Sequence, residues 1–209
     1  MSAPSMTLYY NPGSPFARKV LVVLHETGQA ARVALKLTQP TPVSPAPALV
    51  AENPLGKLPV LVLAEGSVVH DSRVICEYLD SQHVGQGLLP AAGDLRWRRL
   101  TLASLADGVM DAALLIRYEQ ALRSQDKHWD QWLDNQALKI ERALAYLERD
   151  CLAELSASFD MASIGAACAL GYLDFRQPQL DWRKRYAGLA AWYAEVSERP
   201  SMLASQPHA

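Results

Sequence analysis

A serine stands at a turn where its hydroxyl could stabilise the thiolate of a bound molecule. The segment Gly13-Ser14-Pro15-Phe16-Ala17 joins a β-rich run to a helical one. A Cys-x-x-Cys pair at such a turn would gain from the positive end of the helix, but Ser14 and Ala17 occupy its two places. The thiol must therefore come with a ligand, and the Ser14 hydroxyl can donate a hydrogen bond that favours its thiolate. A plain N-cap role for Ser14 explains the same turn.

A proline stands where a later apolar strand begins. In Asn53-Pro54-Leu55-Gly56-Lys57-Leu58-Pro59-Val60, Pro59 directly precedes the apolar run. A cis bond between Leu58 and Pro59 would turn the Leu58 N–H and C=O outward, where an extended peptide could pair with them. A proline that simply begins a strand is the alternative interpretation.

A third polar group lies where a hairpin strand passes into a helix, in His70-Asp71-Ser72-Arg73. The unpaired N–H groups at a helix start attract a carboxylate. Asp71 and Ser72 could therefore bind a charged ligand, or they could only cap the helix. The chain's five histidines show no metal-ligand spacing, so we expect them to be surface or capping residues.

Short strands and helices must position these three segments. The exposed, proline-studded stretch 39–47 is expected to be a mobile connector rather than a central strand or a long helix. The hydrophobic periods predict a βαβ unit followed by a ββα unit. Its parts are a strand at 7–10, a helix with apolar residues at 17–24, a strand at 32–37, a hairpin of 58–64 and 67–70, and a helix at 72–83.

The rest of the chain is rich in Ala and Leu and helical in period. We predict a first domain at 1–84, a linker at 85–93 and an all-helical domain at 94–209. Asp160 is expected to cap the third of its helices and Cys151 to lie in the core. The predicted helices cover 94–123, 128–155, 161–175 and 186–198.

Composition limits the partners of the chain. Its 209 residues carry 20 Lys+Arg against 22 Asp+Glu, a formal net charge of −2. Without a basic excess we expect neither nucleic acid nor an anionic membrane as a partner. Three widely spaced cysteines favour a reducing compartment, and the apolar runs are too short to span a bilayer. We therefore expect a soluble, cytoplasmic protein.

Three blocks together resemble the soluble glutathione transferase family, and the resemblance covers nearly the whole chain. Near the C-terminus, Ala191-Trp192-Tyr193 and Glu198-Arg199-Pro200-Ser201 are similar to the family's signature. In detail, residues 106–112 and 167–176 look most like a bacterial serine-type subgroup. The three blocks are Ser14-Pro15-Phe16-Ala17-Arg18-Lys19-Val20, Asn53-Pro54-Leu55-Gly56-Lys57-Leu58-Pro59-Val60-Leu61 and Asp71-Ser72-Arg73-Val74-Ile75-Cys76-Glu77-Tyr78-Leu79.

The resemblance implies an α/β plus all-α fold, with a thioredoxin-like first domain and a helical second one. It implies glutathione as co-substrate without a metal, and transfer of its thiolate to an apolar electrophile or a peroxide. Ser14 would contact the sulfur, the Leu58 backbone beside cis Pro59 the cysteinyl unit, and Asp71 with Ser72 the γ-glutamyl group. Lys57 is a weaker candidate for a glutathione carboxylate. The alternative is a glutathione-binding homologue with little transferase activity, acting in interaction or thiol handling.

Two further features follow from the resemblance. The family forms homodimers, in which Asp107 could reach the γ-glutamyl ammonium of the other subunit; an ordinary solvated helix aspartate is the alternative. The family often has Ser or Thr at the cap of the sixth helix and Asp three residues on. Here Asp160 and Ser163 reverse that order, a swap that can keep the helix cap.

Overall fold

The chain folds into two compact units in the computed structural model, which describes residues 5–208. The first unit holds the described residues up to Leu89 together with those from Pro200 onward, and the second is Pro90–Arg199. The sequence pattern grouped the residues after 199 with the helices, whereas their contacts group them with the first unit.

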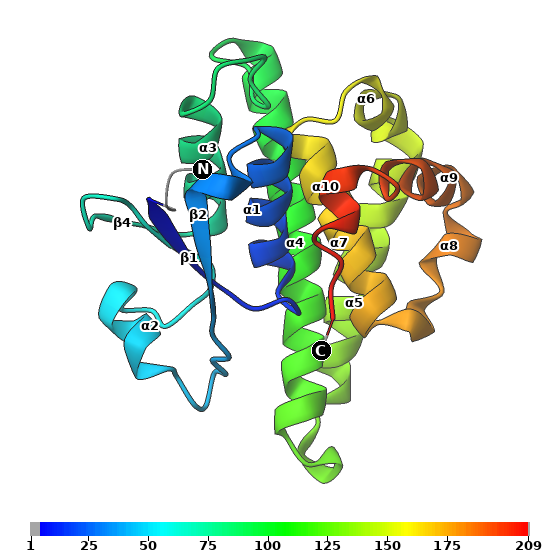
Figure 1. The fold of residues 1–209 in the computed structure, drawn as a ribbon. Helices are drawn as coiled ribbons and strands as arrows, with labels where there is room; N and C mark the ends of the chain where they lie inside the picture. Colours follow the sequence, from blue (N-terminus) through cyan, green and yellow to red (C-terminus); the bar gives the residue numbers. More distant parts are fainter. Residues whose placement is uncertain (1–4, 209) are drawn as a thin grey trace. The chain divides into compact units, whose positions relative to one another are not determined.

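One mixed sheet with strand order β2-β1-β3-β4 forms the centre of the first unit (Figure 1). β1 is parallel to β2 and antiparallel to β3, and β4 is antiparallel to β3. The strands are β1 (Met6–Tyr10), β2 (Val33–Leu37), β3 (Val60–Val62) and β4 (Val68–Val69). The succession of strands and helices confirms the predicted thioredoxin-like βαβ-ββα arrangement.

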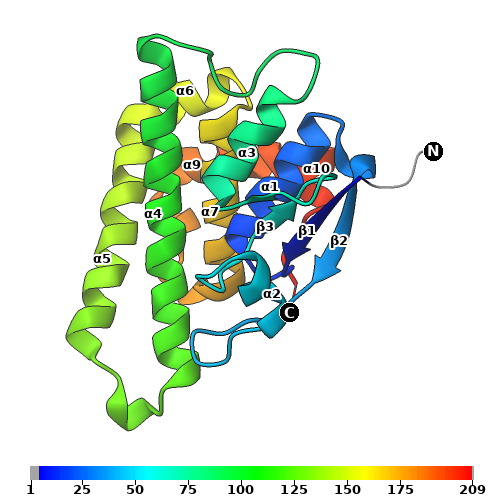
Figure 2. The ribbon, with the colours of Figure 1, turned by 90° about the vertical axis from the view of Figure 1, so that its left-hand side faces the viewer.

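Helices cover both faces of this sheet (Figure 2). Because side chains alternate along a strand, Tyr9 and Val60 point to one face, where they pack with Leu49 of α2. Leu8 and Leu61 point to the other face, which α1 and α3 cover, and both are fully buried. The sequence pattern did not predict α2. The helices are α1 (Pro15–Glu26), the short 3-10 turn η1 (Ala30–Arg32), α2 (Pro47–Glu52) and α3 (Ser72–Ser81).

The short helix α10 (Pro200–Leu203) packs on α1. Arg18 of α1 is only 4% exposed, and its Nη2 donates a hydrogen bond to the Met202 carbonyl at 3.2 Å. The Ser201 hydroxyl donates to a carboxylate oxygen of Glu26. These polar contacts attach the end of the chain to the first unit.

The second unit is helical throughout, and its α4 packs against both α5 and α7. At the α4–α7 contact, a Cβ on Gly165 would lie 3.2 Å from the Ala106 Cβ, so any larger residue would require the helices to shift by a few tenths of an ångström. Its elements are α4 (Asp94–Leu122), η2 (Gln125–Lys127), α5 (Asp130–Tyr146), η3 (Leu147–Cys151), α6 (Leu152–Ala157), α7 (Met161–Arg176), η4 (Pro178–Leu180), α8 (Trp182–Arg185) and α9 (Ala187–Val196).

More of α7 is buried than the single apolar face that its sequence pattern predicts. Every residue from Met161 to Leu173 is buried, so these turns of α7 are covered on all sides. Small residues and apolar ones fill these positions, as a helix surrounded by protein requires.

The predicted helix at 128–155 is interrupted by the five-residue π-helical segment η3. Within it, the Glu148 carboxylate accepts hydrogen bonds from the backbone N–H groups of Gly188 at 2.9 Å and Leu189 at 2.7 Å, at the start of α9. A Cβ on Gly188 would lie 2.5 Å from the Leu152 side chain. Cys151, at the end of η3, is fully buried as predicted, and burial raises the pKa of its thiol.

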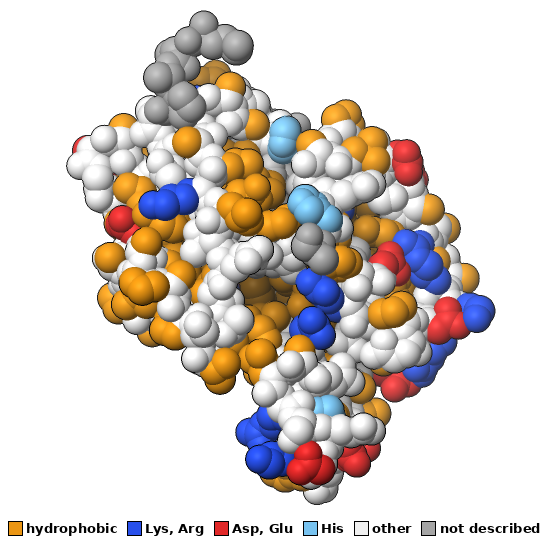
Figure 3. All heavy atoms as spheres, turned by 60° about the horizontal axis from the view of Figure 1, so that its bottom comes forward, with side chains coloured by type: hydrophobic (Ala, Val, Ile, Leu, Met, Phe, Trp, Pro, Cys, Tyr) orange, Lys and Arg blue, Asp and Glu red, His pale blue; other side chains and the backbone are white. Residues whose placement is uncertain are grey.

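The surface carries both charged and apolar groups. On the face drawn in Figure 3, Lys and Arg side chains are interspersed with acidic and hydrophobic ones. Exposed apolar residues include Trp97, 66% exposed, and Trp129, 62% exposed. Within residues 5–208, no helix combines the length and the apolar composition that crossing a bilayer requires.

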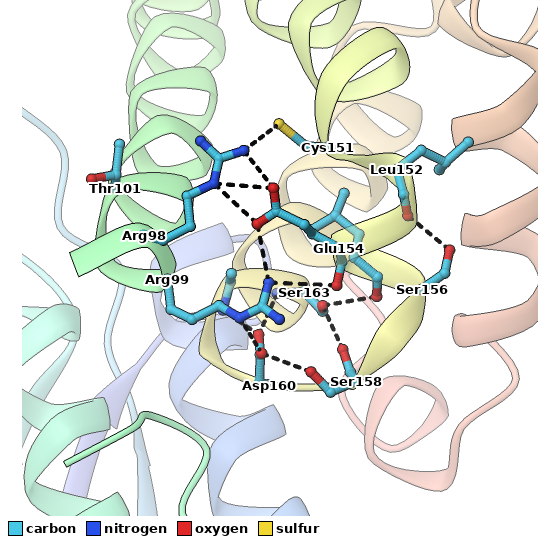
Figure 4. A network of polar contacts seen from close by, with 12 residues as sticks. Arg98, Arg99, Thr101, Cys151, Leu152, Glu154, Ser156, Ser158, Asp160 and Ser163 are labelled. Carbon is cyan, nitrogen blue, oxygen red and sulfur yellow. Dashed lines mark hydrogen bonds and ion pairs between the residues drawn. The ribbon is translucent and has the colours of Figure 1, made fainter. Parts of the chain in front are cut away.

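Two adjacent arginines of α4 join α6 to the start of α7 (Figure 4). Arg98 forms an ion pair with Glu154 at 2.6 Å, and the Arg99 Nε lies 2.9 Å from an Asp160 carboxylate oxygen. Asp160 is the N-cap of α7, as the sequence predicted, and accepts from the N–H groups of Ala162 and Ser163. The network therefore fixes the beginning of α7 against α4.

Candidate functional site

Three chain segments meet at one edge of the sheet in the first unit. Tyr9, near the end of β1, is paired with Val60, the first residue of β3. Val69, the last residue of β4, is paired with Leu61. Since β1 and β4 end where β3 begins, the turn before α1, the loop before β3 and the start of α3 share this edge. The structure thus brings the three predicted motifs to one place.

Ser14 caps α1, and its hydroxyl oxygen accepts a hydrogen bond from the Ala17 N–H at 3.3 Å. Asn11 holds the turn, because its Oδ1 accepts from the Gly13 N–H at 2.8 Å and its carbonyl from the Ser14 N–H at 2.9 Å. Capping uses the hydroxyl as an acceptor and leaves its hydrogen able to donate. A cap role and a donor role for Ser14 are therefore compatible, and the first turn of α1 carries no acidic residue that would oppose an anion.

The Leu58–Pro59 peptide bond is cis, as the sequence analysis predicted. The Leu58 side chain packs against the apolar cluster of Tyr9, Leu49 and Val60. Within the described residues, the N–H and C=O of Leu58 form no hydrogen bond. Both groups can therefore pair with a ligand.

Asn53 supports this loop, although the sequence analysis did not single it out. It is 2% exposed; its Nδ2 donates to the Lys57 carbonyl at 3.0 Å, and its Oδ1 accepts from the Leu55 N–H at 3.1 Å. The Asn53-Pro54 pair could have indicated this role, since the side chain of an asparagine in a turn often forms a hydrogen bond with the backbone two residues later. Lys57 itself is exposed, and its ammonium has no partner among residues 5–208.

Asp71 caps α3 and accepts a hydrogen bond from the Arg73 N–H at 2.9 Å. Its side chain is 55% exposed and lies 3.3 Å from the Arg73 guanidinium. Burial acts to raise the pKa of Asp71, but the hydrogen bond and charge of Arg73 outweigh it and lower that pKa. Asp71 is therefore a carboxylate at neutral pH. Ser72 follows at the first helical position and is 3% exposed, and the peptide bond before Asp71 is also cis.

Asp107 lies on α4 in the helical unit and is 5% exposed. The alternative of an ordinary solvated aspartate is therefore wrong, because this face of α4 is buried. Its role across a subunit interface stays a prediction. In the part of the chain that the structure describes, no three His, Cys, Asp or Glu side chains are grouped in a way that could hold a metal ion.

Comparison with known proteins agrees with this geometry. The family description "Glutathione S-transferase, N-terminal domain" matches residues 13–82, and "Glutathione S-transferase, C-terminal domain" matches residues 130–195. The GST-like protein YibF of Escherichia coli (strain K12) is 34% identical over 93% of this chain and 95% of its own. The chain belongs to the glutathione S-transferase family.

Solved structures of glutathione transferases show the same fold. A family member from Pseudomonas fluorescens Pf-5 with bound glutathione is 61% identical, with a TM-score of 0.97 over 98% of this chain and 100% of that one. A family member from the same strain, with bound S-(propanoic acid)-glutathione, is 60% identical, with a TM-score of 0.92 over 97% and 100%. The family and the two-part fold predicted from the three blocks are confirmed.

Proposed function

We propose that this glutathione transferase activates glutathione at Ser14 and transfers its thiolate to an electrophilic carbon or to a peroxide oxygen. The observation that carries this proposal is the half-buried Ser14 hydroxyl at the N-terminus of α1, with its hydrogen able to donate. In a conjugation, the C–S bond forms as the leaving group departs with its electron pair. In a peroxide reduction, the thiolate sulfur attacks one oxygen, the O–O bond breaks, and the other oxygen takes a proton and leaves as an alcohol or water. A second glutathione then converts the resulting sulfenic acid to glutathione disulfide and water.

The energies suffice for thiol activation. A free thiol has a pKa of ~8.5, and lowering it by ~2 units requires roughly 2.7 kcal/mol. One hydrogen bond to a charged group supplies ~1.5–3 kcal/mol. The end of α1 adds ~0.3–1 kcal/mol. One hydroxyl at a helix start can therefore make the bound thiol largely anionic at neutral pH.

The remaining predicted residues fit an extended tripeptide. The free N–H and C=O of Leu58, beside Pro59, would pair with the cysteinyl unit. The Asp71 carboxylate would hold the γ-glutamyl ammonium, and Ser72 with the N–H groups of α3 its carboxylate. Lys57 would approach the glycine carboxylate. The Pseudomonas relative was solved with bound glutathione, which supports glutathione as the ligand.

A panel of electrophiles and peroxides with glutathione tests the reaction. We expect a rate above that of buffer for at least one acceptor, and loss of that rate in Ser14→Ala. The alternative function, glutathione binding with little turnover, is favoured if calorimetry detects glutathione binding while every acceptor reacts at the buffer rate. If glutathione does not bind, both proposals are wrong.

We further propose that the transferase works as a homodimer in a reducing cytoplasm, with a first domain at 1–84, a linker at 85–93 and a helical domain that begins at residue 94. The described residues from Pro200 onward pack with the first unit. Its three cysteines are buried, and none of them forms a disulfide within residues 5–208, which suits a reducing compartment. Sedimentation at micromolar concentration should give about twice the chain mass of 23.0 kDa. A monomer would remove any role for Asp107 across an interface.

A further inference from the structure

Two partly buried arginines of the helical unit have no acidic partner among residues 5–208. Arg117 lies near the C-terminal end of α4, and Arg176 is the last residue of α7. Within residues 5–208, neither guanidinium forms an ion pair or a hydrogen bond, and the side chain of Arg176 lies over the Phe175 ring, 3.9 Å from its centre. A partly desolvated cation without a counter-charge is less stable than a paired one, so these two positions favour the binding of an anion.

The acids nearest in sequence are committed to other partners. Glu119, two residues after Arg117, forms an ion pair with Arg123 at 3.1 Å. Asp174, two residues before Arg176, pairs with Arg183 at 2.7 Å. It also accepts a hydrogen bond from the Trp182 indole at 2.8 Å. Neither acid therefore neutralises the arginine beside it in sequence.

Helix packing places the two arginines near each other. The Gln177 side chain, directly after Arg176, donates to the Ala113 carbonyl at 3.4 Å, and Ala113 lies one turn before Arg117 on α4. Burial lowers the pKa of Arg176, and the charge of Arg117 lowers it further. Two like charges therefore lie close enough to interact where α4 and α7 meet.

Two phenols complete this cluster. Tyr172 lies one turn before Arg176 on the same side of α7 and is 2% exposed. Burial raises the pKa of Tyr172 to about 12, so its hydroxyl keeps its proton and can donate a hydrogen bond. Tyr118 follows Arg117 on α4, and burial raises the pKa of its phenol, so this hydroxyl also keeps its proton at neutral pH. Tyr118 lies close enough to Tyr172 for the two side chains to interact.

We propose that Arg117 and Arg176, together with Tyr118 and Tyr172, bind the carboxylate of a small organic acid with an aromatic or apolar body. Guanidinium groups bind planar carboxylates through paired hydrogen bonds, and the neutral phenols add donors. The partly exposed rings of Phe175 and Tyr118 offer contact to the apolar body. One negative charge between two guanidiniums relieves their repulsion.

Direct binding tests the site without transferase activity. We would titrate 2-naphthoate and its neutral analogue 2-naphthamide into the full chain by calorimetry at low ionic strength. We expect naphthoate to bind at least tenfold more tightly than naphthamide. The double variant Arg117→Gln/Arg176→Gln should lose at least tenfold in naphthoate affinity and leave naphthamide unchanged.

Arg123→Gln is the matched control, because it removes the same charge directly after α4, at an arginine that already has Glu119 as its partner. It should keep naphthoate affinity within twofold. The single variants Arg117→Lys and Arg176→Lys keep the charge and guard against a folding defect in the double variant; each should bind naphthoate with intermediate affinity. Equal affinity for naphthoate and naphthamide, no binding of naphthoate, or an equal loss in Arg123→Gln would overturn the proposal.

A kinetic arm distinguishes two sources of the carboxylate, and it rests on the proposed transferase function. Glutathione thiolate displaces chloride from 4-chloro-3-nitrobenzoate or its neutral amide: a C–S bond forms, the C–Cl bond breaks, and the thiol proton passes to buffer. If the acceptor itself carries the carboxylate, the double variant loses kcat/KM for the benzoate only. If both acceptors react equally in parent and variant, the site holds a separate acid. No reaction with either acceptor counts against the proposed function, while the naphthoate titration still decides the site.

Discussion

Two helices in different units begin with an aspartate N-cap, yet the two carboxylates lie in opposite surroundings. The Asp71 side chain, at the start of α3, is 55% exposed and its charged neighbour is Arg73, two residues away. The Asp160 side chain, at the start of α7, is 14% exposed and pairs with Arg99 of another helix at 2.9 Å. Asp160 also accepts a hydrogen bond from Ser158 at 2.8 Å.

The difference shows that a cap motif by itself does not define a role. Asp160 has all its acceptor capacity used within the protein, so its charge serves the fold. Asp71 keeps half of its surface open at the sheet edge shared with Ser14, so its charge can serve a ligand. Ser14 resembles Asp71 in this respect, since its hydroxyl caps a helix and still has a hydrogen that it can donate to a ligand.

Breaking the buried cap should have the largest effect. Asp160→Ala removes a cap and leaves Arg99 with one fewer counter-charge, so we expect the free energy of unfolding to fall by about 3 kcal/mol. Urea denaturation measures this. Asp160→Asn keeps a capping oxygen without the charge and should lose less. A fall for Asp71→Ala as large as that for Asp160→Ala would remove the distinction between the two caps.

Breaking the exposed cap should affect binding instead. Asp71→Ala/Ser72→Ala should weaken glutathione binding roughly ten- to hundredfold, because hydrogen bonds to charged groups are lost. The free energy of unfolding should fall by only about 1 kcal/mol, the usual loss of a cap. Isothermal calorimetry gives the affinity, and Asp94→Ala at the start of α4 is the control. Unchanged affinity would show that Asp71 and Ser72 only cap α3.

Ser14 can be tested by two substitutions that separate donation from nucleophilicity. Ser14→Ala should raise the pKa of bound glutathione by ~1–2 units, followed by thiolate absorbance across pH, and should lower kcat more than affinity. In Ser14→Cys, the introduced thiolate can attack a disulfide, release one thiol and be resolved by glutathione. We expect disulfide reduction to appear while conjugation falls. If Ser14→Ala keeps the parent's thiolate titration, a backbone N–H of the same turn activates the sulfur.

The smallest expected change is the loss of stability at acid pH that comes from the Arg98–Glu154 ion pair. The hydrogen bond from Arg98 lowers the pKa of Glu154 against the opposing effect of burial. A carboxyl whose pKa is depressed on folding stabilises the protein above its unfolded pKa of ~4.3, and this contribution is lost as pH falls through the lower folded value. Glu154→Gln should therefore show a shallower loss of stability below about pH 4.3 in urea titrations. An unchanged slope would mean that the network does not titrate.

Much of the local structure followed from residue order. Asn11-Pro12-Gly13 ends β1 and Ser14 begins α1, since proline and glycine break a strand and a hydroxyl caps a helix. The N-cap of α7 at Asp160 and the burial of Cys151 could also be predicted from the sequence. The pattern missed α2, because prolines on both sides of it look like a connector, and it missed the π-helical η3 because an apolar stripe continues through it.

By itself, the sequence determined the family, most of the order of strands and helices, and the three motifs of the proposed glutathione site, because capping, turn and periodicity signals act over a few residues. Only the tertiary structure decided which polar groups are free and which are used. Burial of Asp107, support of the loop by Asn53, the pairing of Asp160 with Arg99 and the isolation of Arg117 with Arg176 all depend on residues far apart in the chain. Their physical reason is that desolvation and charge pairing are set by neighbours in space, and the chain brings those neighbours together only when it packs.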